Sequence, residues 1–169
     1  MNSGIWKVPL FDVSFDALET DAVQKVLASG WLTMGQVTQE FERRFAGFLG
    51  VKYAFAVSSA TAGLHLANMA IGIGADDEVI CPSLTFVAGA NTILCCGGRP
   101  VFADAADTSD FNICARTIEL KITTRTRAIQ VMHYGGSPCE MDPIMELARR
   151  HDLFVIEDCA HAPGAVYNG

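Results

Sequence analysis

The 169-residue sequence has few basic residues: 12 Lys and Arg stand against 19 Asp and Glu, which gives a net charge of −7. A protein that binds a nucleic-acid backbone needs a basic face to neutralise the phosphates, so nucleic acid is not an expected partner. Only 18% of the residues are charged while 50% are apolar, a balance that is typical of a packed chain and excludes disorder. The length predicts one hydrophobic core of ordinary size.

Paired metal-ligand spacings are also absent. The six cysteines contain no C-x-x-C pair, and neither they nor the four histidines fall at the short spacings of structural zinc sites. We therefore expect no metal, and we interpret most of the cysteines as small buried hydrophobic residues. The first residues lack the basic segment and the continuous apolar stretch of a signal peptide. These absences together indicate a reduced, cytoplasmic protein.

No apolar run is continuous enough to cross a membrane. Residues 53–75 and 79–98 are uncharged and reach the length of about 20 residues that a bilayer requires. Both are interrupted by Ser, Thr and Asn, and the second also by a proline and a Gly-Gly pair. A buried strand followed by a buried helix explains each run, so we expect no membrane partner.

Strand and helix patterns alternate along the chain, without repeats, low-complexity tracts or linkers. This alternation predicts the α/β class, with a largely parallel sheet covered on both faces in a three-layer α/β/α arrangement. A charged, Thr-rich segment around residues 117–126 has neither pattern. Strands are expected at residues 53–57, 78–81, 100–103, 128–132 and 153–156, and helices at 16–29, 36–48, 61–71, 85–96 and 143–151.

Polar residues follow four of the predicted strands, at the edge where ligands bind in open α/β sheets. Any one of them is explained as a helix N-cap, since Ser and Thr are common there. Taken together, they outline one site. The four groups are Ser58, Ser59 and Thr61; Ser83 and Thr85; His133 and Tyr134; and Glu157, Asp158 and His161.

Residues 58–67 (SSATAGLHLA) place small side chains where a strand turns into a helix. Free backbone N–H groups and the positive end of a helix can bind a phosphate there. The sequence contains neither G-x-x-x-x-G-K-[ST] nor G-x-G-x-x-G, so neither a P-loop nor a dinucleotide fingerprint is supported.

Asp158 lies two residues after the apolar run LFVI (153–156), at the end of a predicted buried strand, which suggests a carboxylate held at the floor of a pocket. A buried carboxylate needs a cationic or multiply donating partner. The alternative is a structural Asp that caps the next turn.

Five segments, in order, resemble the N-terminal half of the large domain of the DegT/DnrJ/EryC1/StrS family. These are sugar aminotransferases of the fold-type-I class that depend on pyridoxal 5′-phosphate (PLP). Within the family, SSATAG, the HYxG element and His161 are most similar to the UDP-4-amino-4-deoxy-L-arabinose aminotransferases. The segments are SGWLTMG (29–35), SSATAGLHLA (58–67), DEVICPSLTFVAGANTIL (77–94), HYGGSPCEMDPIMELARRH (133–151) and VIEDCAHAPGA (155–165).

The resemblance implies that Ala60, Thr61 and Ala62 bind the cofactor phosphate through backbone and hydroxyl groups. It also implies that Phe86 stacks on the pyridine ring. Without the resemblance, a lone aromatic residue beside apolar neighbours is interpreted as core.

The resemblance also implies that Asp158 pairs with the pyridine nitrogen and keeps it protonated. His161 would contact the phenolic oxygen of the cofactor. Without the resemblance, it is a lone histidine near a turn.

One feature departs from the family pattern. A PLP aminotransferase needs a lysine that forms the Schiff base and moves a proton between two substrate carbons. The lysines present, Lys7, Lys25, Lys52 and Lys121, lie in no matching motif, so no catalytic residue is assigned. We interpret residues 1–169 as the N-terminal part of the PLP-binding large domain, without the rest of that domain and the small C-terminal domain.

The expected activity of the whole protein is PLP-dependent transamination of a nucleotide-linked keto-sugar to an amino-sugar, with glutamate as donor, in a homodimer that serves polysaccharide biosynthesis. A sugar dehydratase on the same scaffold, with His in place of the lysine, is an alternative. A non-catalytic PLP-binding or oligomerising module is another. A generic Rossmann-type oxidoreductase is disfavoured by the missing glycine fingerprint. The fragment alone is expected to be inactive.

Overall fold

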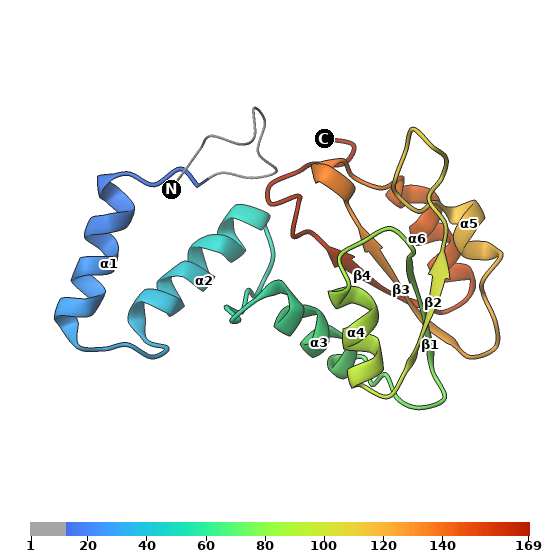
Figure 1. Cartoon of the computed structure of the whole chain (residues 1–169), viewed down its shortest axis with the longest axis horizontal. Coiled ribbons are helices and arrows are strands. Elements are labelled where there is room, and N and C mark those ends of the chain that lie inside the picture. The colour runs from blue at the N-terminus through green and yellow to red at the C-terminus, as the bar shows by residue number, and fades with distance from the viewer. Residues whose placement is uncertain (1–12) are drawn as a thin grey trace, which may run out of the picture. The chain divides into compact units, whose positions relative to one another are not determined.

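The computed structural model describes residues 13–169 (Figure 1). The chain divides into two compact units, and the boundary between them in the sequence falls between Ala56 and Val57. No helix in the described residues is long and apolar enough to cross a membrane.

Within residues 13–56, the N-terminal unit contains two helices, α1 (Ala17–Ser29) and α2 (Gln36–Leu49), close to the predicted ranges. Asp16 begins α1 as an N-cap: its Oδ1 accepts a hydrogen bond from the backbone N–H of Leu18 at 2.7 Å, and Glu19 Oε2 accepts one from the Asp16 N–H at 2.8 Å. Gly30 ends α1 in the left-handed conformation.

An aromatic stripe lies along α2, as its sequence spacing predicts. The rings of Phe41 and Phe45 are 5.7 Å apart between centroids, and those of Phe45 and Phe48 are 6.4 Å apart. All three side chains are exposed in this chain. Within the described part of the N-terminal unit, the stripe is therefore an exposed apolar face.

The C-terminal unit is built on a four-stranded, fully parallel sheet in the order β2-β1-β3-β4. Four main helices cover it, two on each face, so the unit has the predicted three-layer α/β/α architecture (Figure 1). The strands are β1 (Glu78–Pro82), β2 (Arg99–Ala103), β3 (Thr126–Met132) and β4 (Phe154–Asp158). The helices are α3 (Ala60–Ala70), α4 (Ala88–Cys95), α5 (Ala115–Glu119) and α6 (Met141–Arg150).

Alternate strand residues supply two separate cores, because successive side chains of a strand point to opposite faces. On one face, Ile80, Ile129 and Val131 pack with Ile118 of α5 and Ile144 of α6. On the other face, strand residues pack with α3 and α4 in two smaller clusters, which contain Val79, Cys81, Ala128 and Ile93, and Ile156, Leu64 and Ala88.

A buried carboxylate anchors the edge of the sheet where the strands begin. Glu78 is buried, and its carboxylate accepts hydrogen bonds from the Thr123 hydroxyl at 2.6 Å and from the Arg125 guanidinium at 2.7 Å. Arg99, the first residue of β2, lies 3.5 Å away. The starts of three neighbouring strands are thus tied to one side chain.

Three sequence predictions need correction. Residues 53–57 do not form a strand, because a strand needs a hydrogen-bonded neighbour and no described segment pairs with them. Helix α4 begins at Ala88 rather than at 85, and the hydroxyl of Thr85 instead lies 2.9 Å from Met132 Sδ. The segment around 117–126 contains part of α5, a five-residue helix too short to produce a periodic pattern.

The cysteines are less buried than expected. Cys81 and Cys139 are buried, whereas Cys95 and Cys159 are exposed. The two exposed residues lie at ends of elements, Cys95 at the end of α4 and Cys159 just after β4, where the core no longer covers them. Cys96 and Cys114 are partly exposed.

Candidate functional site

Helix α3 begins with unsatisfied backbone donors. The Ser59 hydroxyl accepts a hydrogen bond from the N–H of Ala62 at 3.2 Å, and its backbone is extended. Within residues 13–169, the N–H groups of Ala60 and Thr61 have no acceptor. Two free donors therefore coincide with the positive end of an 11-residue helix, an arrangement that suits a phosphate.

The start of α3 lies at the carboxyl edge of the sheet. The helix runs antiparallel to the strands, since it ends at Ala70 shortly before β1 begins. Leu64, in its second turn, packs against Ile156 of β4. The start of α3 lies one helical turn before Leu64. Asp158 lies two residues after Ile156 and therefore points to the same face of β4. The free N–H groups and Asp158 therefore share one edge and one face of the sheet.

Asp158 is a buried carboxylate with little compensation. Asp158 is only 6% exposed. Its Oδ1 accepts one hydrogen bond, from the Ala160 N–H at 3.0 Å. No cationic side chain pairs with it in the part of the chain that the structure describes. A buried charge of this kind calls for a charged donor. The protonated ring nitrogen of PLP fits that requirement, so the residues present suit the cofactor.

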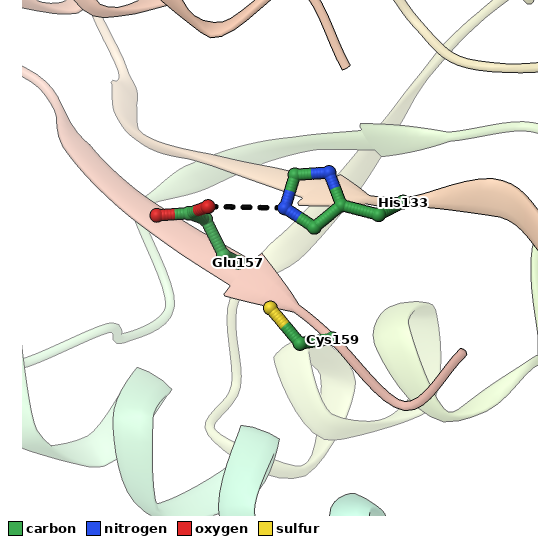
Figure 2. A group of neighbouring side chains, drawn as sticks. All are labelled: His133, Glu157 and Cys159. Atoms are coloured by element: carbon green, nitrogen blue, oxygen red, sulfur yellow. Dashed lines mark hydrogen bonds and ion pairs between the residues drawn. The ribbon is translucent and has the colours of Figure 1, made fainter. Parts of the chain in front are cut away.

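Glu157 points to the opposite face of β4, as period-two alternation predicts. Its Oε2 lies 3.0 Å from Nε2 of His133, the residue that follows β3 (Figure 2). The Nδ1 atom of His133 accepts a hydrogen bond from the Cys139 N–H at 3.1 Å. Because Nδ1 accepts, the ring proton is on Nε2, and His133 donates to Glu157. Both ring nitrogens are therefore occupied.

Cys159 completes a group of three possible metal ligands with His133 and Glu157, whose ligand atoms all lie within 4.8 Å of one another (Figure 2). A metal on Nε2 would require the ring proton on Nδ1, which faces the Cys139 N–H. Metal-bound histidines instead donate from the other nitrogen to an acceptor. Although Cys159 is exposed as a residue, partial desolvation of its sulfur and the nearby carboxylates of Glu157 and Asp158 raise the pKa of the thiol, which disfavours the thiolate. This geometry does not favour a metal site.

His161 lies beside the turn that follows β3. Its Nδ1 accepts a hydrogen bond from the Gly135 N–H at 3.3 Å, and its ring meets the Tyr134 ring edge-on, with centroids 6.1 Å apart. His161 is exposed. The turn after β3 therefore fixes the position of the His161 ring, and the ring is not part of the buried core.

Phe86 lies between β1 and α4 and is 67% exposed, so its interpretation as a core residue is wrong. An exposed aromatic ring in the loop after a strand is free to stack on a ligand.

Asn112 and Cys139 support the segment that follows β3, but the sequence did not mark either of them as part of the site. Asn112 bonds to the backbone of residues 134–138, and Cys139 supplies the N–H that fixes the His133 ring. Their partners lie between 6 and 26 residues away along the chain, so no local pattern marks them.

A parallel sheet with a helix N-terminus and a buried aspartate at its carboxyl edge is the arrangement that the resemblance to the large domain of PLP-dependent aminotransferases predicts. Residues 14–169 match the model of the DegT/DnrJ/EryC1/StrS aminotransferase family, and the chain belongs to this family. The predicted family, fold class and cofactor are thereby confirmed.

Individual relatives agree with this assignment. GDP-perosamine synthase of Caulobacter vibrioides is 48% identical over 155 residues, which cover 91% of this chain and 42% of the relative. The aminotransferase from Psychrobacter cryohalolentis superposes with a TM-score of 0.88 at 43% identity, over 92% of this chain and 40% of that one. Spr1654 of Streptococcus pneumoniae, solved in its PLP form, gives 0.90 at 28% identity, over 97% and 45%. The chain thus spans about two-fifths of the relatives it matches.

Proposed function

We propose that this chain forms the cofactor-binding part of a PLP-dependent aminotransferase that converts a nucleotide-linked keto-sugar to an amino-sugar. The observation that carries the proposal is Asp158, a buried carboxylate without a cationic partner in the described residues. It shares its edge and face of the sheet with the free N–H groups of α3. The two features would meet the nitrogen and the phosphate of one PLP molecule.

Each residue at this edge has a separate task. Ala60 and Thr61 bind the phosphate at the start of α3 through their free N–H groups, where the helix dipole favours an anion. Ala62, the third residue of the predicted phosphate site, has its N–H bonded to the Ser59 hydroxyl, so its part is to hold the turn that presents the other two. Asp158 keeps the ring nitrogen protonated, while the Nε2–H of His161 donates to the phenolic oxygen. Phe86 covers one face of the ring. When bound, PLP supplies an electron-withdrawing ring that stabilises negative charge on the substrate carbon.

The C-terminal unit supplies no amine for proton transfer at this edge. Its single lysine, Lys121, lies two residues before Thr123, which bonds to Glu78 at the start of β1. That is the edge of the sheet opposite to Asp158. The unit is thus equipped to hold the cofactor but not to move a proton between substrate carbons, so we expect no turnover from the isolated chain.

The substrate class rests on the relatives. One of them is named a GDP-perosamine synthase, which is consistent with a nucleotide-linked keto-sugar as acceptor for this protein. Glutamate is proposed as the amino donor, and a cytoplasmic homodimer as the working form. The exposed phenylalanine stripe of α2 is consistent with such a dimer.

The cofactor site is tested with 4′-deoxypyridoxine 5′-phosphate, a PLP analogue without the aldehyde that would react with surface lysines. Isothermal titration of the 169-residue chain should detect binding. Removing the phosphate from the probe should weaken binding about 10- to 100-fold, the range expected for charge-assisted hydrogen bonds.

Asp158→Asn should weaken binding of the same probe, whereas Glu157→Gln, one residue away on the other face, should leave it nearly unchanged. Equal affinity for the probes with and without phosphate would contradict the assignment of α3. Equal effects of the two substitutions would contradict the assignment of Asp158.

A further inference from the structure

A buried asparagine between β2 and α5 controls the turn after β3. Asn112 is 4% exposed, although it lies in a loop. Its Oδ1 accepts a hydrogen bond from the Tyr134 N–H at 2.9 Å, and its Nδ2 donates to the Ser137 carbonyl at 3.1 Å and to the Pro138 carbonyl at 3.4 Å. One side chain thus bonds to the backbone at both ends of this turn.

The same turn contacts His161. Gly135 has a φ of 60° and donates its N–H to His161 Nδ1 at 3.3 Å, while the Tyr134 ring packs edge-on against the imidazole. A Cβ on Gly136 would lie 3.1 Å from the His161 carbonyl oxygen, so the two backbones approach closely. The orientation of the Gly135 N–H therefore depends on how the turn is held.

We infer that Asn112 is a positioning residue, which orients the Gly135 N–H toward His161 Nδ1 and so fixes the ring proton of His161 on Nε2. With Nδ1 committed as an acceptor, the neutral imidazole presents Nε2–H as its one donor. The use of that donor rests on the proposed function, in which it meets the phenolic oxygen of PLP. The fixed tautomer itself does not depend on the cofactor.

Only an amide meets the needs of this position. The Tyr134 N–H requires an acceptor and the two carbonyls require a donor, and Asn offers both from one planar group. An aspartate of the same shape would keep the acceptor but place a negative charge against two carbonyl oxygens. Asn112→Asp is therefore the informative variant, because it preserves volume and removes the donor.

The tautomer is tested on the 169-residue chain without any cofactor, by ¹⁵N NMR of the histidine rings, with His161→Gln to assign the signal. The wild-type chain should show His161 with an unprotonated Nδ1 and a protonated Nε2 at neutral pH. In Asn112→Asp, the signals should move toward the averaged values of a ring that exchanges between both tautomers. Thr117→Ala, which removes another buried loop-and-helix hydrogen bond, should leave them unchanged. Unchanged His161 signals in a folded Asn112→Asp chain would overturn the inference.

A double-mutant cycle separates positioning from general support of the fold. Asn112→Asp should weaken binding of 4′-deoxypyridoxine 5′-phosphate about 3- to 10-fold, the range for one misplaced hydrogen bond. In a His161→Ala background the same substitution should have almost no effect. Equal effects in both backgrounds would mean that Asn112 does not act through His161. If the wild-type chain fails to bind the probe, the proposed function fails, and the NMR result alone decides the inference.

Discussion

Asp158 and Glu157 are neighbours in sequence but face opposite sides of β4. Asp158 is buried on the side of α3, and Glu157 bonds to His133 on the other side at 3.0 Å, with its side chain 48% exposed. The pair therefore offers two carboxylates of nearly the same position and different chemistry, which makes each a control for the other.

In an active aminotransferase that contains residues 1–169, Asp158→Asn should lower turnover by about 10²–10⁴, the usual size of a lost electrostatic or acid–base contribution. Glu157→Gln should retain most of the activity. Circular dichroism should show an intact fold for both. Near-normal turnover of Asp158→Asn would mean that Asp158 is only a structural cap.

The isolated 169-residue chain should transfer no amine from glutamate to a keto-sugar, because Lys121 is the sole lysine of the C-terminal unit and lies at the opposite edge of the sheet. A coupled assay for 2-oxoglutarate, with saturating PLP, measures this. A rate above that of free PLP would show that an amine of this chain reaches the site.

Glu78 should make the free energy of unfolding depend on pH in the acidic range. The hydrogen bond from Thr123 and the Arg125 guanidinium lower the pKa of its carboxyl below the ordinary value of 4.5. A lowered folded pKa means that the stabilisation is present above about pH 4.5 and is lost as the pH falls through the folded pKa.

Glu78→Gln should therefore cost about 1–2 kcal/mol at pH 7 and flatten the loss of stability below pH 4.5, measured by urea unfolding at several pH values. Glu119→Gln, which breaks an exposed pair with Arg150, should cost less than about 0.5 kcal/mol. An unchanged acid slope in Glu78→Gln would assign the pH dependence to other carboxylates.

The cysteines should differ in reactivity. Burial raises the pKa of both Cys81 and Cys139 to about 12, so iodoacetamide at pH 8 should leave them unmodified in the native chain. Cys95 should react first, and Cys159, although also exposed, should react more slowly because partial desolvation of its sulfur and two nearby carboxylates raise its pKa. Mass spectrometry of digested chain measures the order. Protection of Cys159 by added zinc would contradict the tautomer assigned to His133.

The chain should self-associate. The stripe of Phe41, Phe45 and Phe48 is exposed, and an apolar face of this kind is costly in water. Light scattering should show particles larger than a monomer, and Phe48→Lys should reduce their size. A monodisperse wild-type monomer would count against the homodimer.

Local pattern was enough for the parallel sheet, because its strands are short apolar runs that need no distant information to recognise. The run at residues 53–57 has the same pattern, and it fails because strand pairing is a property of two segments. Likewise, alternation along β4 correctly separated Asp158 from Glu157. Asn112 escaped notice because its three partners, from Tyr134 to Pro138, are brought to it only by the folded sheet.

The Glu78 anchor has a consequence for how such a domain can change. It ties together the beginnings of three strands, whereas the helix start of α3 and Asp158 stand at the ends where strands finish. The residues that stabilise the sheet and the residues that would bind a ligand thus lie at opposite ends of the same short strands. Loops at the carboxyl edge can therefore change while the packing at the beginnings of the strands stays the same.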